Sequence, residues 1–226
     1  MKTVILELCL MAAWIVPCLV ILGLLRRFTR IPDFVFRKLV HTLYFASAAF
    51  LLTFTHGAGF ALADCLVILA FWTPILLWAE HRPWYQRFFV EKRQGEILRT
   101  FWMLYGLLAV MILCCLLTDR PLWIPADAIL LWGVGDMAAA IIGRLFGRKK
   151  YTFGPNKGVK SYVGSLAMLA ATTLTAGLLC IPDPARALPL FLGALCATAV
   201  EALTPGEWDT LTVTLAAFVP LFLMGR

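Results

Sequence analysis

Long apolar segments constrain the fold of this chain more than any other feature of its sequence. Hydrophobic residues make up 62% of the 226 residues, and charged residues make up only 15%. A helix needs about 20 apolar residues to cross the roughly 30 Å of hydrocarbon in a bilayer. Eight segments reach or approach this length: Val4–Leu25, Leu39–Thr55, Gly57–Ala79, Ile97–Leu117, Ala126–Phe146, Ser161–Ile181, Ala187–Leu203 and Thr210–Met224. We therefore predict an all-α, polytopic integral membrane protein with about eight transmembrane helices.

The connections between these segments are too short for a separate soluble domain, since the longest is Glu80–Glu96. We expect one transmembrane domain over residues 1–226. The first segment differs from a cleaved signal peptide, because its basic cluster follows the apolar stretch and no small-residue cleavage site is evident. The seven cysteines form no Cys-x-x-Cys pair, which favours small buried residues over a zinc site or disulfides.

Basic residues gather on alternate connections. The first, third and fifth connections and their edges hold 16 of the 20 Lys and Arg residues. An excess of Lys and Arg marks cytoplasmic loops, so we predict that these connections face the cytoplasm and that both termini lie outside. The net charge of +7 then reflects topology, and we expect no nucleic-acid partner. The membrane would be a bacterial inner membrane or an equivalent plasma membrane, with the active site facing the cytoplasm.

Asp136 is the most unusual residue of the apolar segments, because an ionised carboxylate at membrane depth costs roughly 2.5–3.5 kcal/mol on insertion scales. The predicted topology places it in the cytoplasmic half of the membrane, together with polar residues of five other helices. These residues are His41, Glu96, Lys160 with Ser161, Glu201 and Asp209. Their convergence indicates a shared site, whereas Glu7 and Asp64 fall nearer the outer side.

Several of these residues also have a purely structural interpretation. A stripe of small residues repeats every fourth position, as in closely packed transmembrane helices: Gly135, Ala139, Gly143 and Gly147. Asp136 lies beside this stripe, so its side chain can face a cavity. Basic residues at helix ends are typical interfacial anchors, and this applies to Arg37, Lys38 and Arg144. A histidine such as His41, taken alone, is more often a helix-end residue than a functional one.

The connection Arg148–Ser161 has the composition of an anion-binding loop. Its glycines permit tight turns that expose successive N–H groups. Ser161 is a good N-cap for the following helix, whose positive dipole end then faces the loop. A P-loop is excluded, because Val159 separates the preceding glycine from Lys160 and no strand is expected before the loop. The alternative is a loop that is basic only because it faces the cytoplasm.

Four groups of residues occur in order along most of the chain. They are Arg37-Lys38-x-x-His41, Gly135-Asp136-x-x-Ala139 with Gly143-Arg144-x-x-Gly147, Lys160-Ser161-x-x-Gly164-Ser165, and Glu201 followed by Asp209. In this combination the chain resembles the CTP-dependent polyprenol kinase family, which includes dolichol, phytol and farnesol kinases and is distantly related to the phosphatidate cytidylyltransferases. Asp209-Thr210 departs from the Asp-Asn often found in that family, and the cytidylyltransferase signature is absent.

The resemblance implies transfer of a phosphoryl group from a nucleoside triphosphate, CTP, to a long-chain isoprenoid or other lipid alcohol. The triphosphate would dock in the Arg148–Ser161 connection, with Mg²⁺ as cofactor. Mg²⁺ is usually joined to substrate phosphates by one or two carboxylates. Asp136 would be the first of these metal ligands and Glu201 the second.

Other roles follow from the same resemblance. Lys160 and Arg144 would neutralise charge on the transferred group, since this chemistry depends on positioning and electrostatics. His41 or one of the carboxylates would accept the proton of the alcohol, and Arg37 and Lys38 would hold phosphates or lipid headgroups. The remaining positions implied in nucleotide binding are Gly143, Gly147, Lys157, Ser161, Gly164 and Asp209.

Other functions stay open at this point. A phosphatidate cytidylyltransferase would share the Gly-Asp and Lys-Ser motifs. A transporter could use Asp64, Asp136 and Glu201 as an ion or proton path, although the carboxylates cluster towards one face and the two halves show no inverted repeat. A scaffold subunit could pack through the glycine stripe but would need no cationic loop. The sequence also leaves the lipid alcohol, the nucleotide and a homodimer open.

Overall fold

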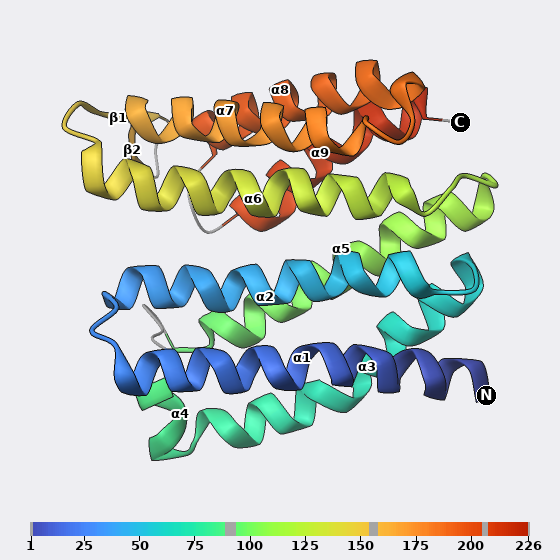
Figure 1. Ribbon diagram of the computed structural model, residues 1–226, viewed down its shortest axis with the longest axis horizontal. Helices are drawn as coiled ribbons and strands as arrows, with labels where there is room; N and C mark the ends of the chain where they lie inside the picture. Colours follow the sequence, from blue (N-terminus) through green and yellow to red (C-terminus); the bar gives the residue numbers. More distant parts are fainter. Residues whose placement is uncertain (1, 89–93, 154–157, 205–207, 226) are drawn as a thin grey trace. The chain divides into compact units, whose positions relative to one another are not determined.

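The computed structural model describes residues 2–88, 94–153, 158–204 and 208–225, which are almost entirely helical (Figure 1). The helices are α1 (Lys2–Phe28), α2 (Asp33–Phe54), α3 (Ala58–Glu80), α4 (Pro83–Phe88), α5 (Glu96–Leu117), α6 (Trp123–Phe146), α7 (Tyr162–Leu179), α8 (Ala187–Leu203) and α9 (Asp209–Met224). Of these described helices, seven are long and apolar enough to cross a membrane: α1, α2, α3, α5, α6, α7 and α8 with its preceding turn. The chain is therefore an all-α polytopic membrane protein, as the apolar segments predict.

Each of the eight predicted segments coincides with a helix, and the eighth, α9, is the shortest of them at 16 residues. The largest difference is at α2, which begins at Asp33, well before the apolar segment Leu39–Thr55. Pro32 precedes the helix, and Asp33 places a carboxylate in its first turn, where the helix dipole favours negative charge. Arg37 and Lys38 consequently lie within a helix and not in a connection.

The chain forms two compact units, Met1–Thr118 and Asp119–Arg226. The first unit contains α1–α5, and the second contains α6–α9 with a short β-hairpin. Asp119, at the start of the second unit, has a φ of 53°, a left-handed conformation that is uncommon for a residue other than glycine. The single domain expected over residues 1–226 stays a prediction.

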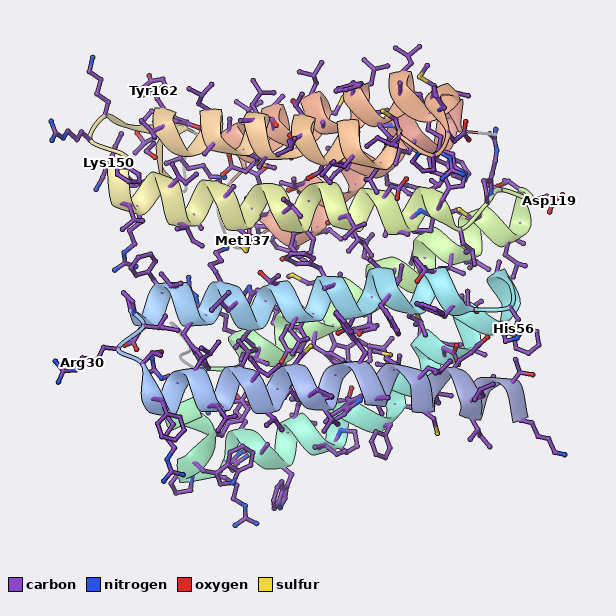
Figure 2. All side chains as sticks on the ribbon, in the orientation of Figure 1. Arg30, His56, Asp119, Met137, Lys150 and Tyr162 are labelled. Carbon is purple, nitrogen blue, oxygen red and sulfur yellow. The ribbon has the colours of Figure 1, made fainter. Side chains whose placement is uncertain are left out.

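The first unit has an apolar core to which each of its long helices contributes. Helix α1 packs on α2 through a cluster of four buried side chains: Leu22, Phe36, Val40 and Leu43. Helix α5 packs on α3 and buries one apolar face. Arg30, between α1 and α2, and His56, between α2 and α3, lie at opposite ends of this unit (Figure 2). Arg30 and His56 thus mark the two ends of the first unit.

Helix α6 is the centre of the second unit, because α7, α8 and α9 all pack against it. Small residues bring α6 and α7 together. A Cβ at Gly135 would lie 2.6 Å from Cγ2 of Thr172, and one at Gly143 would lie 3.1 Å from Cα of Gly164. These distances leave no room for larger side chains and confirm the predicted packing role of the small-residue stripe.

The connection between α6 and α7 contains an antiparallel hairpin, whereas we expected an irregular loop. Strand β1 (Lys150–Phe153) pairs with β2 (Gly158–Ser161), so that Tyr151 lies opposite Lys160. Aromatic and β-branched residues in both strands favour this extended structure. The Tyr151 hydroxyl lies 2.6 Å from Oγ of Ser165 and ties β1 to the first turn of α7. The centre of the predicted anion loop, with Lys157, lies outside the described residues.

Candidate functional site

One ammonium group joins three segments at one end of the second unit. Nζ of Lys160, in β2, donates to Oε1 of Glu201 at 2.7 Å and lies 3.4 Å from both carboxylate oxygens of Asp209. It also donates to the main-chain carbonyl of Glu201. The three side chains are only 13%, 10% and 16% exposed, respectively. We call this the Lys160 cluster, and it is shielded enough for its charges to interact strongly.

The local structure fixes Lys160 in this position. The residue after it, Ser161, caps α7 by accepting a hydrogen bond from the Gly164 N–H at 3.1 Å, as the sequence predicts. Pairing with β1 holds the residue from its other side. Glu201 lies in the last turn of α8, and the Lys160 ammonium stabilises both its carboxylate and the negative end of the helix dipole. Asp209 is the first residue of α9, where a carboxylate is favoured in turn.

The charges of the cluster do not balance, because two carboxylates surround one ammonium. Burial raises the pKa of Asp209 to about 6; the Lys160 ammonium opposes this rise, and the Asp136 and Glu201 carboxylates add to it. Oε2 of Glu201 is buried and receives no hydrogen bond from any residue that the structure describes. The cluster therefore has a spare acceptor and an excess of negative charge, both of which suit a further cation.

Asp136 acts on this cluster from α6. It is half-buried and lies next to Met137, about midway along the helix (Figure 2). Its charge contributes to the raised pKa of Asp209, which places the two carboxylates within electrostatic reach of each other. Lys150 and Tyr162 mark the end of this unit at which the hairpin lies, and Asp119 marks the other end. Arg144 is exposed in the last turn of α6, on the side of the hairpin.

The predicted glycines shape the junction of α6 and α7. A Cβ at Gly147 would meet Oγ of Ser161 at 2.5 Å, and one at Gly143 would meet the same atom at 2.8 Å. Ser161 is itself buried, and its hydroxyl lies 3.4 Å from the carbonyl oxygen of Gly143. In this structure Gly143, Gly147 and Gly164 have a packing role, because they keep the end of α6 in contact with the start of α7.

Arg37, Lys38 and His41 belong to the first unit and lie half-buried on α2. Nη1 of Arg37 lies 3.5 Å from Oε1 of Glu96, at the start of α5. Sequence reasoning identified both residues but did not predict that they would pair. The pairing could have been inferred from their positions near the starts of α2 and α5, because oppositely charged side chains at neighbouring helix ends attract each other.

The described residues contain no group of three or more His, Cys, Asp and Glu side chains arranged to hold a metal ion. Magnesium does not need such a preformed set, since it is commonly held by one or two carboxylates and by substrate phosphates. Glu201, with its buried Oε2, and Asp136, with its charge directed at the same cluster, fit that pattern.

The arrangement combines a shielded ammonium with three carboxylates, beside a basic hairpin. An ammonium can bind a phosphate as a point charge, and carboxylates can hold the cation that accompanies it. No profile of a known protein family, no curated protein and no solved structure matches the chain.

Proposed function

We propose that the protein is a membrane-embedded transferase that moves a phosphoryl group from a nucleoside triphosphate to a long-chain isoprenoid or other lipid alcohol. CTP is the proposed donor, because the motifs of the sequence resemble those of CTP-dependent polyprenol kinases. The observation that carries the proposal is the Lys160 cluster, which joins Lys160, Glu201 and Asp209 in a shielded position of a membrane protein. A lipid substrate can keep its tail in the bilayer while its hydroxyl reaches such a site.

Lys160 is the proposed partner of the transferred group. Its contacts with two carboxylates hold the ammonium in place before the substrate binds. In phosphoryl transfer the charge spreads over the oxygens of the moving group, and a positioned cation stabilises it. Arg144 and the exposed basic residues at the start of the hairpin would neutralise the rest of the triphosphate; these residues are Arg148, Lys149 and Lys150.

Asp136 and Glu201 are the proposed ligands of magnesium. When bound, Mg²⁺ would neutralise negative charge on the phosphates and help to orient them. Asp209 is the proposed proton acceptor for the alcohol, because its pKa of about 6 lies close to neutral pH, where a general base works best. His41 stays a prediction for the same step. The proposed orientation places this end of the second unit at the cytoplasmic face.

Two labelled forms of CTP test the proposal with purified protein in lipid nanodiscs. The reaction would contain Mg²⁺ with farnesol, phytol and longer polyprenols, and in a parallel reaction phosphatidate. Label that passes from the γ-phosphate into an alcohol supports the kinase. Label from the α-phosphate that enters lipid only with phosphatidate would instead identify a cytidylyltransferase. No lipid label from either form would reject a transferase and favour transport. The Lys160→Met protein serves as the inactive control.

A further inference from the structure

A second group of titratable side chains lies in the first unit, at the end where α1 begins and α2 meets α3. Asp64, on α3, is 0% exposed and Glu7, on α1, is 3% exposed. Their carboxyl groups are within hydrogen-bonding reach of each other. His56 contacts the same pair: its main-chain N–H donates to Oε1 of Glu7 at 2.9 Å, and its ring Nδ1 lies 2.6 Å from that oxygen.

The contact between the two carboxyl groups lacks a hydrogen-bond donor. Both oxygens of Asp64 and Oε2 of Glu7 are buried and accept no hydrogen bond from an N–H or O–H group of the described residues. Ionised carboxylates offer only acceptors, so no donor holds the two groups together. Two carboxylates that share a site away from water cannot both remain charged, and one of them then retains a proton. A single proton would supply the missing donor.

The depth of the two carboxyl groups in the membrane strengthens the need for a shared proton. Asp64 follows the start of α3 by six residues and Glu7 follows the start of α1 by five, which corresponds to about 9 Å and about 8 Å along the helices. Both helices are among those able to cross a membrane. An ionised carboxylate in the hydrocarbon region is unfavourable, so a proton that removes one of two negative charges stabilises the pair.

One side chain that contacts this pair of carboxyl groups also reaches water. Asp64 is adjacent to Cys65 and acts on its thiol, and Tyr105 of α5 interacts electrostatically with that thiol and with Tyr44 of α2. A thiol and two phenols bring no positive charge. The His56 ring acts electrostatically on Glu7, and its side chain is 58% exposed. An imidazole ring can accept a proton at one nitrogen and donate one from the other, so His56 connects the buried pair with solvent.

We propose that Glu7 and Asp64 bind one exchangeable proton within the membrane and that His56 carries this proton between water and the carboxyl pair. In the loading step, the neutral His56 ring, with its own proton on Nδ1, takes a proton from hydronium in the solvent at Nε2 and gives the Nδ1 proton to Glu7. The ring is left with its proton on Nε2, and exchange with water restores the Nδ1–H form. The proton on Glu7 is shared with Asp64. The pair passes from two negative charges to one, and release runs through the same atoms in reverse. This site is separate from the proposed phosphoryl transfer.

Infrared spectroscopy of the full-length protein in nanodiscs tests the proposal. The difference between wild type and Asp64→Asn should contain the carbonyl band of a protonated carboxylic acid at neutral pH. In Glu7→Gln this band should shift, because the hydrogen-bond partner of the acid changes. After transfer to D2O, the isotope shift of the band should be at least about tenfold slower in His56→Gln. His81→Gln is the matched control, because His81 is exposed just after the other end of α3 and its ring Nδ1 lies 2.8 Å from the Leu77 carbonyl oxygen.

Three spectroscopic results would overturn the proposal. If Asp64→Asn removes no acid band, the pair holds no proton. If Na⁺ abolishes the band and choline at equal ionic strength does not, the pair is a cation site. If His56→Gln exchanges as fast as wild type, His56 is not the carrier. A hydrophobic carbodiimide provides a test without substitutions, since it should modify Glu7 or Asp64 of the wild type, less so as the pH rises. Absence of this adduct at low pH would also contradict a bound proton.

Discussion

Nζ of Lys160 lies 2.7 Å from Oε1 of Glu201, although 41 residues separate them in the chain. This contact connects the strand before α7 with the last turn of α8, and both side chains are nearly buried. A buried ion pair adds little net stability when complete, but removal of one partner leaves an uncompensated charge. Lys160 therefore holds two helix ends together and, in the proposed reaction, occupies the centre of the site.

Replacement of Lys160 by Met should abolish the proposed kinase activity, with a loss of about 100-fold or more. It should also lower the free energy of unfolding by about 3–5 kcal/mol, because Glu201 and Asp209 lose their cation. Lys160→Arg keeps the charge and should recover most of the stability. Lys2→Met is the matched control, because Lys2 is exposed at the start of α1 and has no role in the proposed site. Thermal unfolding in detergent and the labelled-CTP assay measure both effects. Equal losses in the two Met variants would argue against a special role for Lys160.

Asp136→Asn should reduce turnover by about 100-fold or more while the protein still inserts into the membrane. The amide has nearly the same size but cannot provide a carboxylate for a metal–phosphate complex. Asp127→Asn is the control on the same helix, because Asp127 is buried near the other end of α6. Normal activity of Asp136→Asn, measured beside this control, would remove Asp136 from the proposed site.

Gly164→Ala should destabilise the second unit by about 1–3 kcal/mol through overpacking. Its Cβ would lie 3.0 Å from the Ala139 carbonyl oxygen and 3.2 Å from Cα of Gly143, and these backbone atoms cannot move aside without separating α6 from α7. Gly177→Ala on the same helix has nothing within 4 Å and should be neutral or slightly stabilising, because Ala is the better helix former. The midpoints of thermal unfolding of the two variants test whether Gly164 lies in a close contact between α6 and α7. Similar midpoints for both variants would contradict the close packing.

Asp209 should make stability depend on pH. Its pKa of about 6 in the folded protein exceeds the ordinary 3.8, so ionisation is less favourable in the folded state than in the unfolded state. The contribution of Asp209 is therefore complete below pH 4 and declines as the pH rises through about 6. The midpoint temperature of unfolding of Asp209→Asn, minus that of wild type, should increase between pH 4.5 and pH 7.5, measured with EDTA present. Asp119→Asn, at an exposed aspartate of the same unit, should show no such trend. If this difference in midpoint decreases as the pH rises, the pKa of Asp209 is not raised in the folded protein.

Membrane topology can be tested within each unit by labelling of single cysteines in a protein that lacks its seven native ones. Cysteines at Arg30 and Lys150 should react from the cytoplasmic side, because basic connections face the cytoplasm. Cysteines at His56 and Asp119 should react from the outside, since they lie at the opposite ends of their units (Figure 2). Labelling of Arg30 and His56 from one side would contradict the predicted topology.

Seven of the eight predicted spans and their approximate ends followed from the sequence, because the thickness of hydrocarbon sets the length of an apolar segment. The eighth segment is a helix, α9, but with 16 residues it is shorter than the seven helices able to span a membrane. Ser161 as the cap of α7 was also predictable, since capping depends on residues close together in the chain. The small-residue stripe predicted a closely packed face of α6 for the same reason, because side chains four residues apart share one face of a helix. Local rules also explain why α2 begins earlier than its apolar segment: Pro32 and Asp33 form a helix start that hydropathy does not detect.

Contacts between distant segments were decided only by the tertiary structure. The sequence placed Lys160, Glu201 and Asp209 in one half of the membrane, but not in contact. It likewise placed Glu7 and Asp64 nearer the outer side and gave no reason to join them to His56. Position along an apolar segment gives the depth of a side chain, whereas the rotation of each helix about its axis decides which side chains meet. That rotation is set by the packing of all neighbouring helices together, and no single segment encodes it.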